Sequence, residues 1–287
     1  MPAHLHLHLP QAPSLILTRP PSDAGDDARS LALRQAGVVL HAFPLIRILP
    51  PRDAAPAAQM LAALADFDLA VPVSPAAVHA ALGMLRTPWP QTCAVGLLGP
   101  GSRAAFEQAL RLRGESPEAL RILAAPADAA DSEGLWLALQ GFGASLPQRC
   151  WADARVLLLR GDSGRDWLAD TLTSVGARVC RVSVYRREAP APDEATLERL
   201  RSLLVHSGSS AGRASWLLTA SEGVRNLQKL LAPAGLQASV LGQHRALATH
   251  ARIAASARDI GFGRVELCTA DTASILQVLQ GSRGRPA

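Results

Sequence analysis

The second half of this chain repeats the first, with three segments recurring in the same order. The matched segments are 15–37 with 156–176, 68–82 with 215–230, and 94–110 with 246–262. Equivalent residues lie 141 to 150 positions apart, as Arg19 and Arg160 or Gly99 and Thr249 do. A period this long indicates two copies of a domain rather than an array of short repeats. Two similar domains in one chain predict a cleft between them, where a ligand would bind.

The composition fits two folded domains with an anionic ligand. Hydrophobic residues make up 48% of the chain and charged residues 18%, which is enough apolar material for two cores. The net charge of +5 comes almost wholly from arginine, because Lys229 is the only lysine. Arginine forms paired hydrogen bonds with carboxylates and phosphates. The basic residues are spread along the chain and no nucleic-acid-binding motif is present, so we expect no nucleic-acid partner.

The sequence indicates neither a metal site nor a secretory signal. Cys93, Cys150, Cys180 and Cys268 form no metal-binding pattern and are expected to stay reduced. The His-rich start, residues 4–10, lacks the features of a secretory signal and is interpreted as a flexible leader. No apolar run is long enough to span a bilayer. We therefore expect a soluble cytoplasmic protein with no membrane partner.

Short β-rich runs alternate with helical patterns along the whole chain, which predicts an α/β fold with parallel sheets. The expected strands are 15–18, 69–73, 93–98, 121–124, 155–159, 202–205, 216–219, 246–248 and 264–268. The expected helices are 23–35, 75–84, 102–113, 132–139, 164–174, 193–200, 222–231, 252–260 and 272–279. Residues 125–130 and 141–149 are expected to be loops.

Two extended segments bordered by proline interrupt this alternation at equivalent places in the repeat. They cover residues 41–49 and 181–189, and we interpret them as two crossing strands that link the domains. One domain then combines residues 1–40 and 190–287, and the other holds residues 50–180. The alternative is that both segments are ordinary strands inside contiguous domains.

The turns between strands and helices are candidate sites for the ligand. Helix N-termini carry unpaired N–H groups and a positive dipole end, which favour anions, and in parallel sheets such turns meet at the carboxyl edge. The candidate binding residues are Arg19, Ser74, Pro75, Gly101, Ser102, Thr219, Ala220, Ser221, Thr249 and His250. The alternative for the Ser and Thr residues is ordinary helix capping, which uses the same atoms.

Familiar catalytic motifs are missing. The Gly161–Arg165 segment has neither the lysine of a phosphate-binding loop nor the glycine spacing of a dinucleotide site. The sequence has no GxSxG elbow and no HExxH helix. His79, His206, His244 and His250 show no metal-ligand spacing. We expect neither a cofactor nor a metal.

Tyr185 is the only tyrosine in the chain and lies in the second extended segment, about where the first has Pro44. A pseudo-twofold scaffold treats both ends of a ligand alike, so a residue present in one copy can introduce asymmetry. A phenol with an ordinary pKa of about 10 donates a hydrogen bond at neutral pH and could assist a leaving hydroxyl. Tyr185 is therefore the catalytic candidate. The alternative is a tyrosine that only packs in the linker.

At these residues the chain resembles the uroporphyrinogen-III synthase family. The similarity extends over residues 15–279. Its main markers are the run LLLRGDSGRDWLADTLTSVGARV leading into VYRR, then WLLTASEGVRNL, and finally ATHARIAASARDIGF. The resemblance implies two flavodoxin-like parallel-sheet domains in a pseudo-twofold repeat, joined by a two-stranded linker. It also implies a lyase that cyclises hydroxymethylbilane to uroporphyrinogen III, with loss of water and inversion of ring D.

The resemblance further implies a substrate with eight carboxylates, no cofactor, and a monomer that receives hydroxymethylbilane from hydroxymethylbilane synthase. Tyr185 matches the family tyrosine that is thought to help the hydroxyl depart. Two positions depart from the family pattern. Val73 replaces a hydroxyl residue and leaves Ser74 as the nearby candidate, and His250 stands where the first copy has Pro100.

Two other functions fit the same architecture. A two-domain sensor that closes on a small anion without catalysis would have the same cleft and linker, but no use for a lone tyrosine there. A two-domain nucleotide-sugar transferase would bind a nucleotide tightly.

Overall fold

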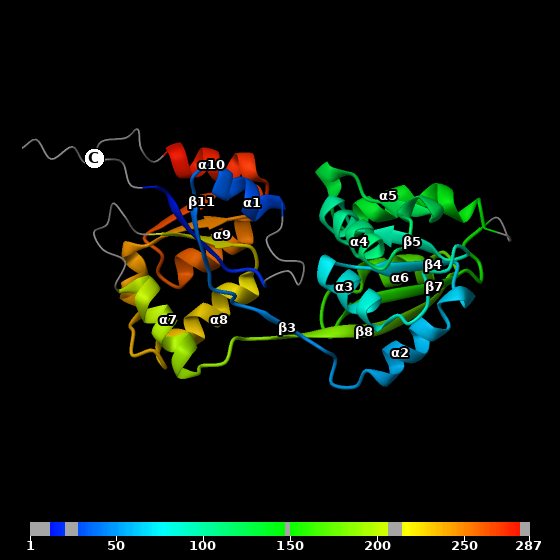
Figure 1. The fold of residues 1–287 in the computed structure, drawn as a ribbon, viewed down its shortest axis with the longest axis horizontal. Coiled ribbons are helices and arrows are strands. Elements are labelled where there is room, and N and C mark those ends of the chain that lie inside the picture. Colours follow the sequence, from blue (N-terminus) through cyan, green and yellow to red (C-terminus); the bar gives the residue numbers. More distant parts are fainter. Residues whose placement is uncertain (1–11, 21–27, 147–149, 206–213, 282–287) are drawn as a thin grey trace, which may run out of the picture. The chain divides into compact units, whose positions relative to one another are not determined.

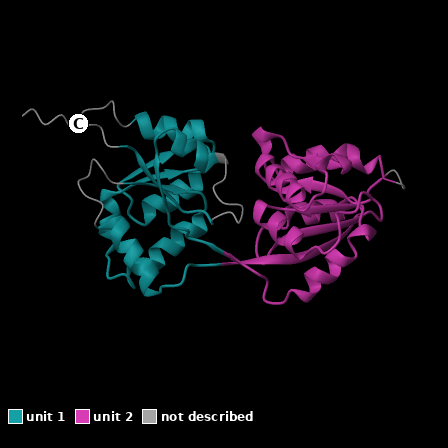
Figure 2. Ribbon diagram, viewed as in Figure 1, with its two compact units in different colours: residues 1–47, 188–287 teal, residues 48–187 magenta. Residues whose placement is uncertain are grey.

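The computed structural model describes residues 12–20, 28–146, 150–205 and 214–281. The His-rich start, residues 23–27 of the first expected helix and His206 lie outside these ranges. The chain divides into two compact units, which Figure 2 shows in different colours. Unit 1 consists of Met1–Arg47 and Glu188–Ala287, and unit 2 consists of Ile48–Arg187.

Unit 1 contains a five-stranded parallel sheet (Figure 1). Its strands lie in the order β2-β1-β9-β10-β11. The bounds of these strands are Ser14–Leu17 for β1, Val39–Ala42 for β2, Ser215–Leu218 for β9, Arg245–Ala248 for β10 and Arg264–Leu267 for β11. If the strands are counted along the chain within the unit, this order is 2-1-3-4-5, the flavodoxin-like arrangement.

Unit 2 has the same arrangement in space, with β7 and β8 in the places of β1 and β2, and adds a sixth strand at one edge. Counted along the chain within the unit, its five parallel strands lie in the order 3-2-1-4-5. Its order is β3-β8-β7-β4-β5-β6, and the five strands from β8 to β6 pair in parallel. The bounds are Arg47–Leu49 for β3, Leu69–Pro72 for β4, Ala94–Leu97 for β5, Ile122–Ala124 for β6, Arg155–Gly161 for β7 and Arg178–Glu188 for β8. The chain passes from unit 1 to unit 2 within β3 and returns at the end of β8.

Each unit combines parts of both sequence copies. The sheet of unit 1 takes β1 and β2 from the first copy and β9, β10 and β11 from the second. The sheet of unit 2 takes β7 and β8 from the second copy and β4, β5 and β6 from the first. The two copies have thus exchanged their first strand pair.

Helices cover both faces of each sheet. Successive side chains of a strand point to opposite faces, and here the apolar side chains on both faces are buried under helices. In unit 1, Ile16 and Trp216 pack with α7, α8 and α9 on one face, while Leu15 and Leu217 pack with α1 and α10 on the other. In unit 2, Leu157 and its neighbours pack against α2, α3 and α4, and Leu158 packs against α5 and α6. The helices of unit 1 are α1 (Ala28–Gln35), α7 (Glu194–Leu204), α8 (Ser221–Leu231), α9 (Ala251–Asp259) and α10 (Thr272–Gly281). Those of unit 2 are α2 (Ala55–Ala62), α3 (Pro75–Met84), α4 (Pro100–Leu112), α5 (Ser132–Gly143) and α6 (Trp167–Ser174).

Two predicted elements were wrong, and two observed elements were not predicted. The strand expected at 202–205 is the end of α7, because Leu197, Leu200, Leu203 and Leu204 form a helical stripe buried against the sheet. The segment 141–149 is not wholly a loop, since α5 continues to Gly143. Helix α2 and strand β2 were not predicted.

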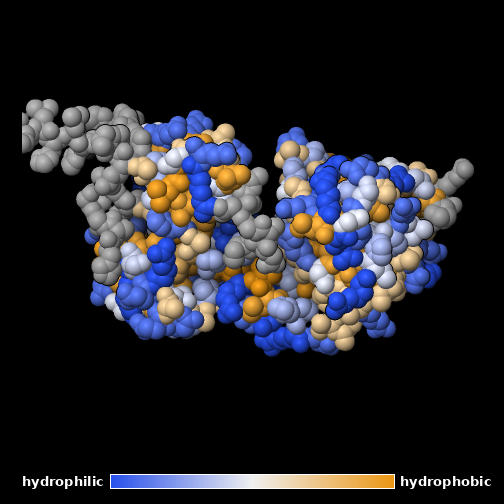
Figure 3. All heavy atoms as spheres, viewed as in Figure 1, coloured by the Kyte–Doolittle hydropathy of each residue, from blue (hydrophilic) through white to orange (hydrophobic). Residues whose placement is uncertain are grey.

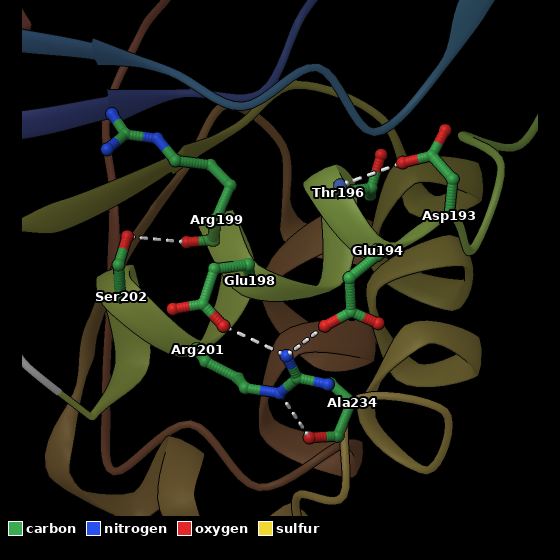
Figure 4. A network of polar contacts seen from close by, with 8 residues as sticks. All are labelled: Asp193, Glu194, Thr196, Glu198, Arg199, Arg201, Ser202 and Ala234. Carbon is green, nitrogen blue, oxygen red and sulfur yellow. Dashed lines mark hydrogen bonds and ion pairs between the residues drawn. The ribbon is translucent and has the colours of Figure 1, made fainter.

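Polar contacts fix α7 and the segment after β2 within unit 1. Arg201 on α7 donates to Glu194 and Glu198 of its own helix, and its Nε donates to the Ala234 carbonyl beyond α8 at 3.1 Å (Figure 4). The buried Asn226 of α8 donates from Nδ2 to the Leu45 carbonyl at 2.8 Å. These contacts tie residues that are far apart in the sequence to the helices that cover the sheet.

The visible surface carries no single apolar band. Figure 3 shows hydrophilic residues spread over each unit, with smaller hydrophobic areas among them. Within the described ranges, no helix has both the length and the apolar character that a membrane crossing requires.

We expect Asn226→Ala to lower the free energy of unfolding of unit 1 by about 1–3 kcal/mol, because the buried Leu45 carbonyl loses its donor. Hydrogen exchange of peptides from β9, measured by mass spectrometry, would report this change in unit 1. Gln228→Ala, at an exposed position on the same helix, is the control and should change exchange little. Equal effects of the two substitutions would contradict the role given to the Asn226 amide.

Candidate active site

In each sheet, the strand order indicates one point on the carboxyl edge as the candidate ligand site. In open parallel sheets, ligands bind beyond the carboxyl ends of the strands, where the direction of winding reverses. In unit 1 this point lies between β1 and β9, and in unit 2 between β7 and β4. The candidate residues follow from what the chain places there.

In unit 2 the structure brings Tyr185 and Ser74 together, although they are 111 residues apart in the chain. The hydroxyl oxygens of the two side chains are 3.3 Å apart, which is hydrogen-bond distance. Tyr185 is 7% exposed, and its ring packs in the core beneath α3. The polar end of the ring is thus directed to the N-terminus of α3, immediately after β4.

Ser74 has a second function at that helix end. Its backbone is extended and its Oγ accepts a hydrogen bond from the Ala77 amide at 3.1 Å, so Ser74 is the N-cap of α3. Pro75 is the first helical residue, where its missing N–H costs nothing. The capping alternative is therefore correct for the Ser74 side chain, and the same oxygen also meets the Tyr185 phenol.

Gly101 and Ser102 lie one strand further along the same sheet, in the first turn of α4 after β5. Gly99 is the N-cap with φ of 149°, and no side chain caps this helix. Ser102 is buried, whereas Gly101 is exposed and has open space where a Cβ would be. The first backbone N–H groups of this helix are therefore not bound by an N-cap side chain.

Unit 1 has two comparable turns on neighbouring strands. Thr219, Ala220 and Ser221 follow β9, with Ala220 as an N-cap that makes no side-chain hydrogen bond. Thr249 and His250 follow β10, and the Thr249 amide donates to the Leu218 carbonyl of β9 at 3.2 Å. The exposed His250 caps α9, because its Nδ1 accepts from the Arg252 amide at 3.1 Å. Thus the two turns lie side by side within unit 1.

Arg19 follows β1 and lies at the reversal point of unit 1. Its Nη2 donates to the buried Ser30 hydroxyl of α1 at 3.1 Å. The guanidinium is therefore held next to the first helix, close to the carboxyl end of β1.

The polar loop that follows β7 was not predicted as part of the site, because residues 161–165 lack the pattern of a phosphate loop. Arg160 forms a hydrogen-bonded ion pair with Asp166 just before α6, and Arg181 of β8 lies 3.4 Å from the same carboxylate. The hydrogen bond from Arg160, together with the charges of both arginines, lowers the pKa of Asp166. Arg165 in this loop pairs with Glu133 at the start of α5. These contacts hold the loop at the carboxyl edge.

The counterpart of Tyr185 in unit 1 is apolar. Ala42 pairs with Leu17 of β1 as Arg181 pairs with Leu158 of β7. After β2 the Leu45 amide donates to the Thr18 carbonyl, one residue short of regular pairing, so this segment also contains an extra residue and Ile46 corresponds to Tyr185. Ile46 is buried. Pro44, the approximate counterpart expected from the sequence, lies two residues earlier. The phenol remains a feature of one unit alone.

The described ranges contain no cluster of three or more His, Cys, Asp or Glu side chains that could hold a metal ion. These turns can offer a ligand backbone amides, hydroxyls, arginines, the imidazole of His250 and one phenol.

We expect Ser74→Ala to destabilise unit 2 by roughly 0.5–2 kcal/mol, because the Ala77 amide loses its cap. Ser74→Thr keeps a hydroxyl and should retain most of that stability. Urea unfolding monitored by hydrogen exchange of α3 peptides measures both. A Ser74→Ala protein as stable as the parent would contradict the capping geometry.

Comparisons with known proteins agree with this architecture. Residues 27–277 match the family described as "Uroporphyrinogen-III synthase HemD". The chain is 32% identical over 272 residues to the uroporphyrinogen-III synthase of Salmonella typhimurium, and 30% identical over 275 residues to that of Escherichia coli K12. Each comparison covers 93% of this chain and 100% of the relative.

A solved structure shares the fold. The uroporphyrinogen-III synthetase from Helicobacter pylori superposes with a TM-score of 0.57 at 12% identity, over 94% of this chain and 100% of that one. At that identity the likeness concerns the fold alone. The family match, by contrast, extends through both units and includes every candidate residue from Ser74 to His250. This chain belongs to the uroporphyrinogen-III synthase family.

Proposed function

We propose that this chain is a uroporphyrinogen-III synthase, which cyclises hydroxymethylbilane to uroporphyrinogen III with loss of water and inversion of ring D. The observation that carries the proposal is the family match over residues 27–277, together with relatives of that name aligned over their whole length. The chain is accordingly a lyase of tetrapyrrole biosynthesis.

Binding of the substrate carboxylates is assigned to the turns at the carboxyl edge of each sheet. The substrate carries eight carboxylates, and helix N-termini bind anions through free N–H groups and the helix dipole. In unit 2 these are the starts of α3 and α4, with Ser74, Pro75, Gly101 and Ser102. In unit 1 they are the starts of α8 and α9, with Thr219, Ala220, Ser221, Thr249 and His250, joined by the guanidinium of Arg19.

Tyr185 is assigned the role of proton donor to the departing hydroxyl. The C–O bond of the hydroxymethyl group breaks, and the phenol proton turns the leaving hydroxyl into water. For inversion, the ring D carbon that already carries a bridge attacks the carbon that water has left, and its old bond to that bridge breaks. The freed bridge carbon then bonds to the unsubstituted α-carbon of ring D, which releases one proton and restores the phenol, so that the net change is the loss of one water. The contact between the Tyr185 and Ser74 hydroxyls supports this role, because it holds the phenol oxygen at the end of β4.

The remaining contribution of the protein is positioning. Hydroxymethylbilane closes without an enzyme to the uninverted isomer, so the enzyme must hold a conformation that favours the other attack. Orientation of reacting groups alone can supply several kcal/mol of rate enhancement. We further propose that the protein works as a cytoplasmic monomer without a cofactor and receives its substrate from hydroxymethylbilane synthase.

The direct test is an assay of the purified chain with hydroxymethylbilane, with the two uroporphyrin isomers separated after oxidation. We expect mainly isomer III. Only isomer I above background would overturn the proposal and favour the alternative, a sensor that binds a small anion without catalysis. Such a sensor would slow or leave unchanged the spontaneous closure and make no isomer III.

We expect Tyr185→Phe to lower the turnover number for isomer III by roughly 10–100-fold, because the proton donor is lost while the ring is kept. Urea unfolding of unit 2 should change little, since only one oxygen at the edge of the core is removed. Unchanged turnover would assign Tyr185 to packing alone.

A matched control is Asp193→Ala. It removes the helix cap at the start of α7, where the Thr196 amide donates to Asp193 (Figure 4). Asp193→Ala should lower the free energy of unfolding without the loss of turnover expected for Tyr185→Phe.

A further inference from the structure

Strand β8 contains an irregularity directly before the catalytic candidate. Along β7 and β8 the pairing is regular from Arg155 opposite Arg178 to Arg160 opposite Ser183. The next residue of β7, Gly161, lies opposite Tyr185, so Val184 is an extra residue in β8. One extra residue in one strand of a pair is a β-bulge, which bends the strand and redirects the side chains after it.

The bulge determines which face of the sheet Tyr185 occupies. Successive side chains of a regular strand point to opposite faces. Val184 and Tyr185 are neighbours in sequence, yet both pack in the cluster on the side of α2, α3 and α4. Without the extra residue, Tyr185 would point to the opposite face, away from Ser74. The bulge is therefore what brings the phenol to the start of α3.

The redirected ring lies against Gly161. A Cβ on Gly161 would be 2.9 Å from both Cε2 and Cζ of Tyr185 and 3.1 Å from its hydroxyl oxygen. Contacts under 3.0 Å are essentially never seen for a real Cβ. The Asp162 amide donates to the Tyr185 carbonyl at 3.2 Å, which fixes the backbone of Tyr185 beside the end of β7. No side chain larger than hydrogen fits at position 161 while the phenol keeps this place.

The first sequence copy has neither the glycine nor the tyrosine at the equivalent positions. With the offset of 141 residues that relates Arg19 to Arg160, the counterpart of Gly161 is Pro20. The counterpart of Tyr185 is the buried Ile46. The glycine and the tyrosine therefore occur together in unit 2 and are both absent at the equivalent positions of unit 1.

We propose that Gly161 is a positioning residue for the cyclisation: the bulge at Val184 directs Tyr185 towards Ser74, and the missing side chain of Gly161 leaves the space that the phenol needs. This inference rests on the proposed function and on the role of Tyr185 in it. Gly161 acts through the place of the Tyr185 hydroxyl and makes no contact with the reaction itself.

The first experiment observes the ring without measuring activity. Because Tyr185 is the only tyrosine, protein labelled with ring-¹³C tyrosine gives the NMR signals of this one side chain. Gly161→Ala should shift these signals. Gly96→Ala is the matched control, since its Cβ would crowd Val71 at 3.0 Å in the same sheet but on the face of α5 and α6. The control should leave the tyrosine signals in place.

The second experiment measures turnover to isomer III in a double-mutant cycle. Gly161→Ala alone should reduce turnover roughly 10–100-fold, as Tyr185→Phe does, because in both proteins the donor is missing from its place. Added to Tyr185→Phe, Gly161→Ala should reduce turnover less than threefold further. Gly96→Ala should lower stability and keep turnover.

The outcomes separate this inference from the proposed function. If the parent protein makes no isomer III, the proposed function fails, whatever the NMR signals show. If the parent is active, then unshifted ring signals, unchanged turnover, or a full additional loss in the Tyr185→Phe background would each overturn the role of Gly161.

A suppressor variant covers the case in which Gly161→Ala does not fold. The clash involves the outer ring atoms of Tyr185, which leucine lacks. Tyr185→Leu should therefore restore folding to the Gly161→Ala protein, measured by circular dichroism and urea unfolding. Failure of Tyr185→Leu to restore the fold would mean that the crowding lies elsewhere and would overturn the inference.

Discussion

The parallel pairing of β7 with β4 is the contact on which the rest of the site depends. It aligns Leu69 with Val156 and continues to Pro72 opposite Leu159, so that a strand of the second sequence copy is hydrogen-bonded to a strand of the first. The strand residues on both sides are buried. This pairing places the end of β4, with Ser74 after it, beside the strands that carry Gly161 and Tyr185. Loss of the strand exchange would leave these residues in separate folding units.

The sequence was sufficient for the fold class and insufficient for the details of the site. The long repeat and the alternation of apolar runs with helical patterns predicted parallel α/β sheets correctly. The apolar run at 202–205 was misread as a strand, because a short run of leucines fits a buried strand and a helix stripe equally well. Helix α2 was missed because it has a proline in its first turn and is rich in alanine, which offers little hydrophobic periodicity. The bulge and the close approach of Gly161 depend on pairing between strands, which no local pattern records.

The two units of a duplicated fold are alike, so they can treat the two unlike ends of a ligand differently only where the units differ. Here both units keep the same arrangement of strands in space and comparable helix N-termini, which suits repeated carboxylates. The differences include a phenol where the other unit has Ile46 and a glycine where it has Pro20. Such a change costs the fold little, because it alters one strand end and leaves the leucine-rich strand centres untouched. In the proposed reaction, these positions supply the step that the shared scaffold cannot.

The central claim is that the Tyr185 hydroxyl faces the carbon from which water departs. A crystal structure of the protein with uroporphyrinogen III bound tests it most directly. The account predicts that this hydroxyl lies within reach of the newly formed bridge carbon, directly or through one water, while turn amides bind the carboxylates. A product whose new bridge lies remote from Tyr185, with the phenol bonded to Ser74 alone, would contradict the account.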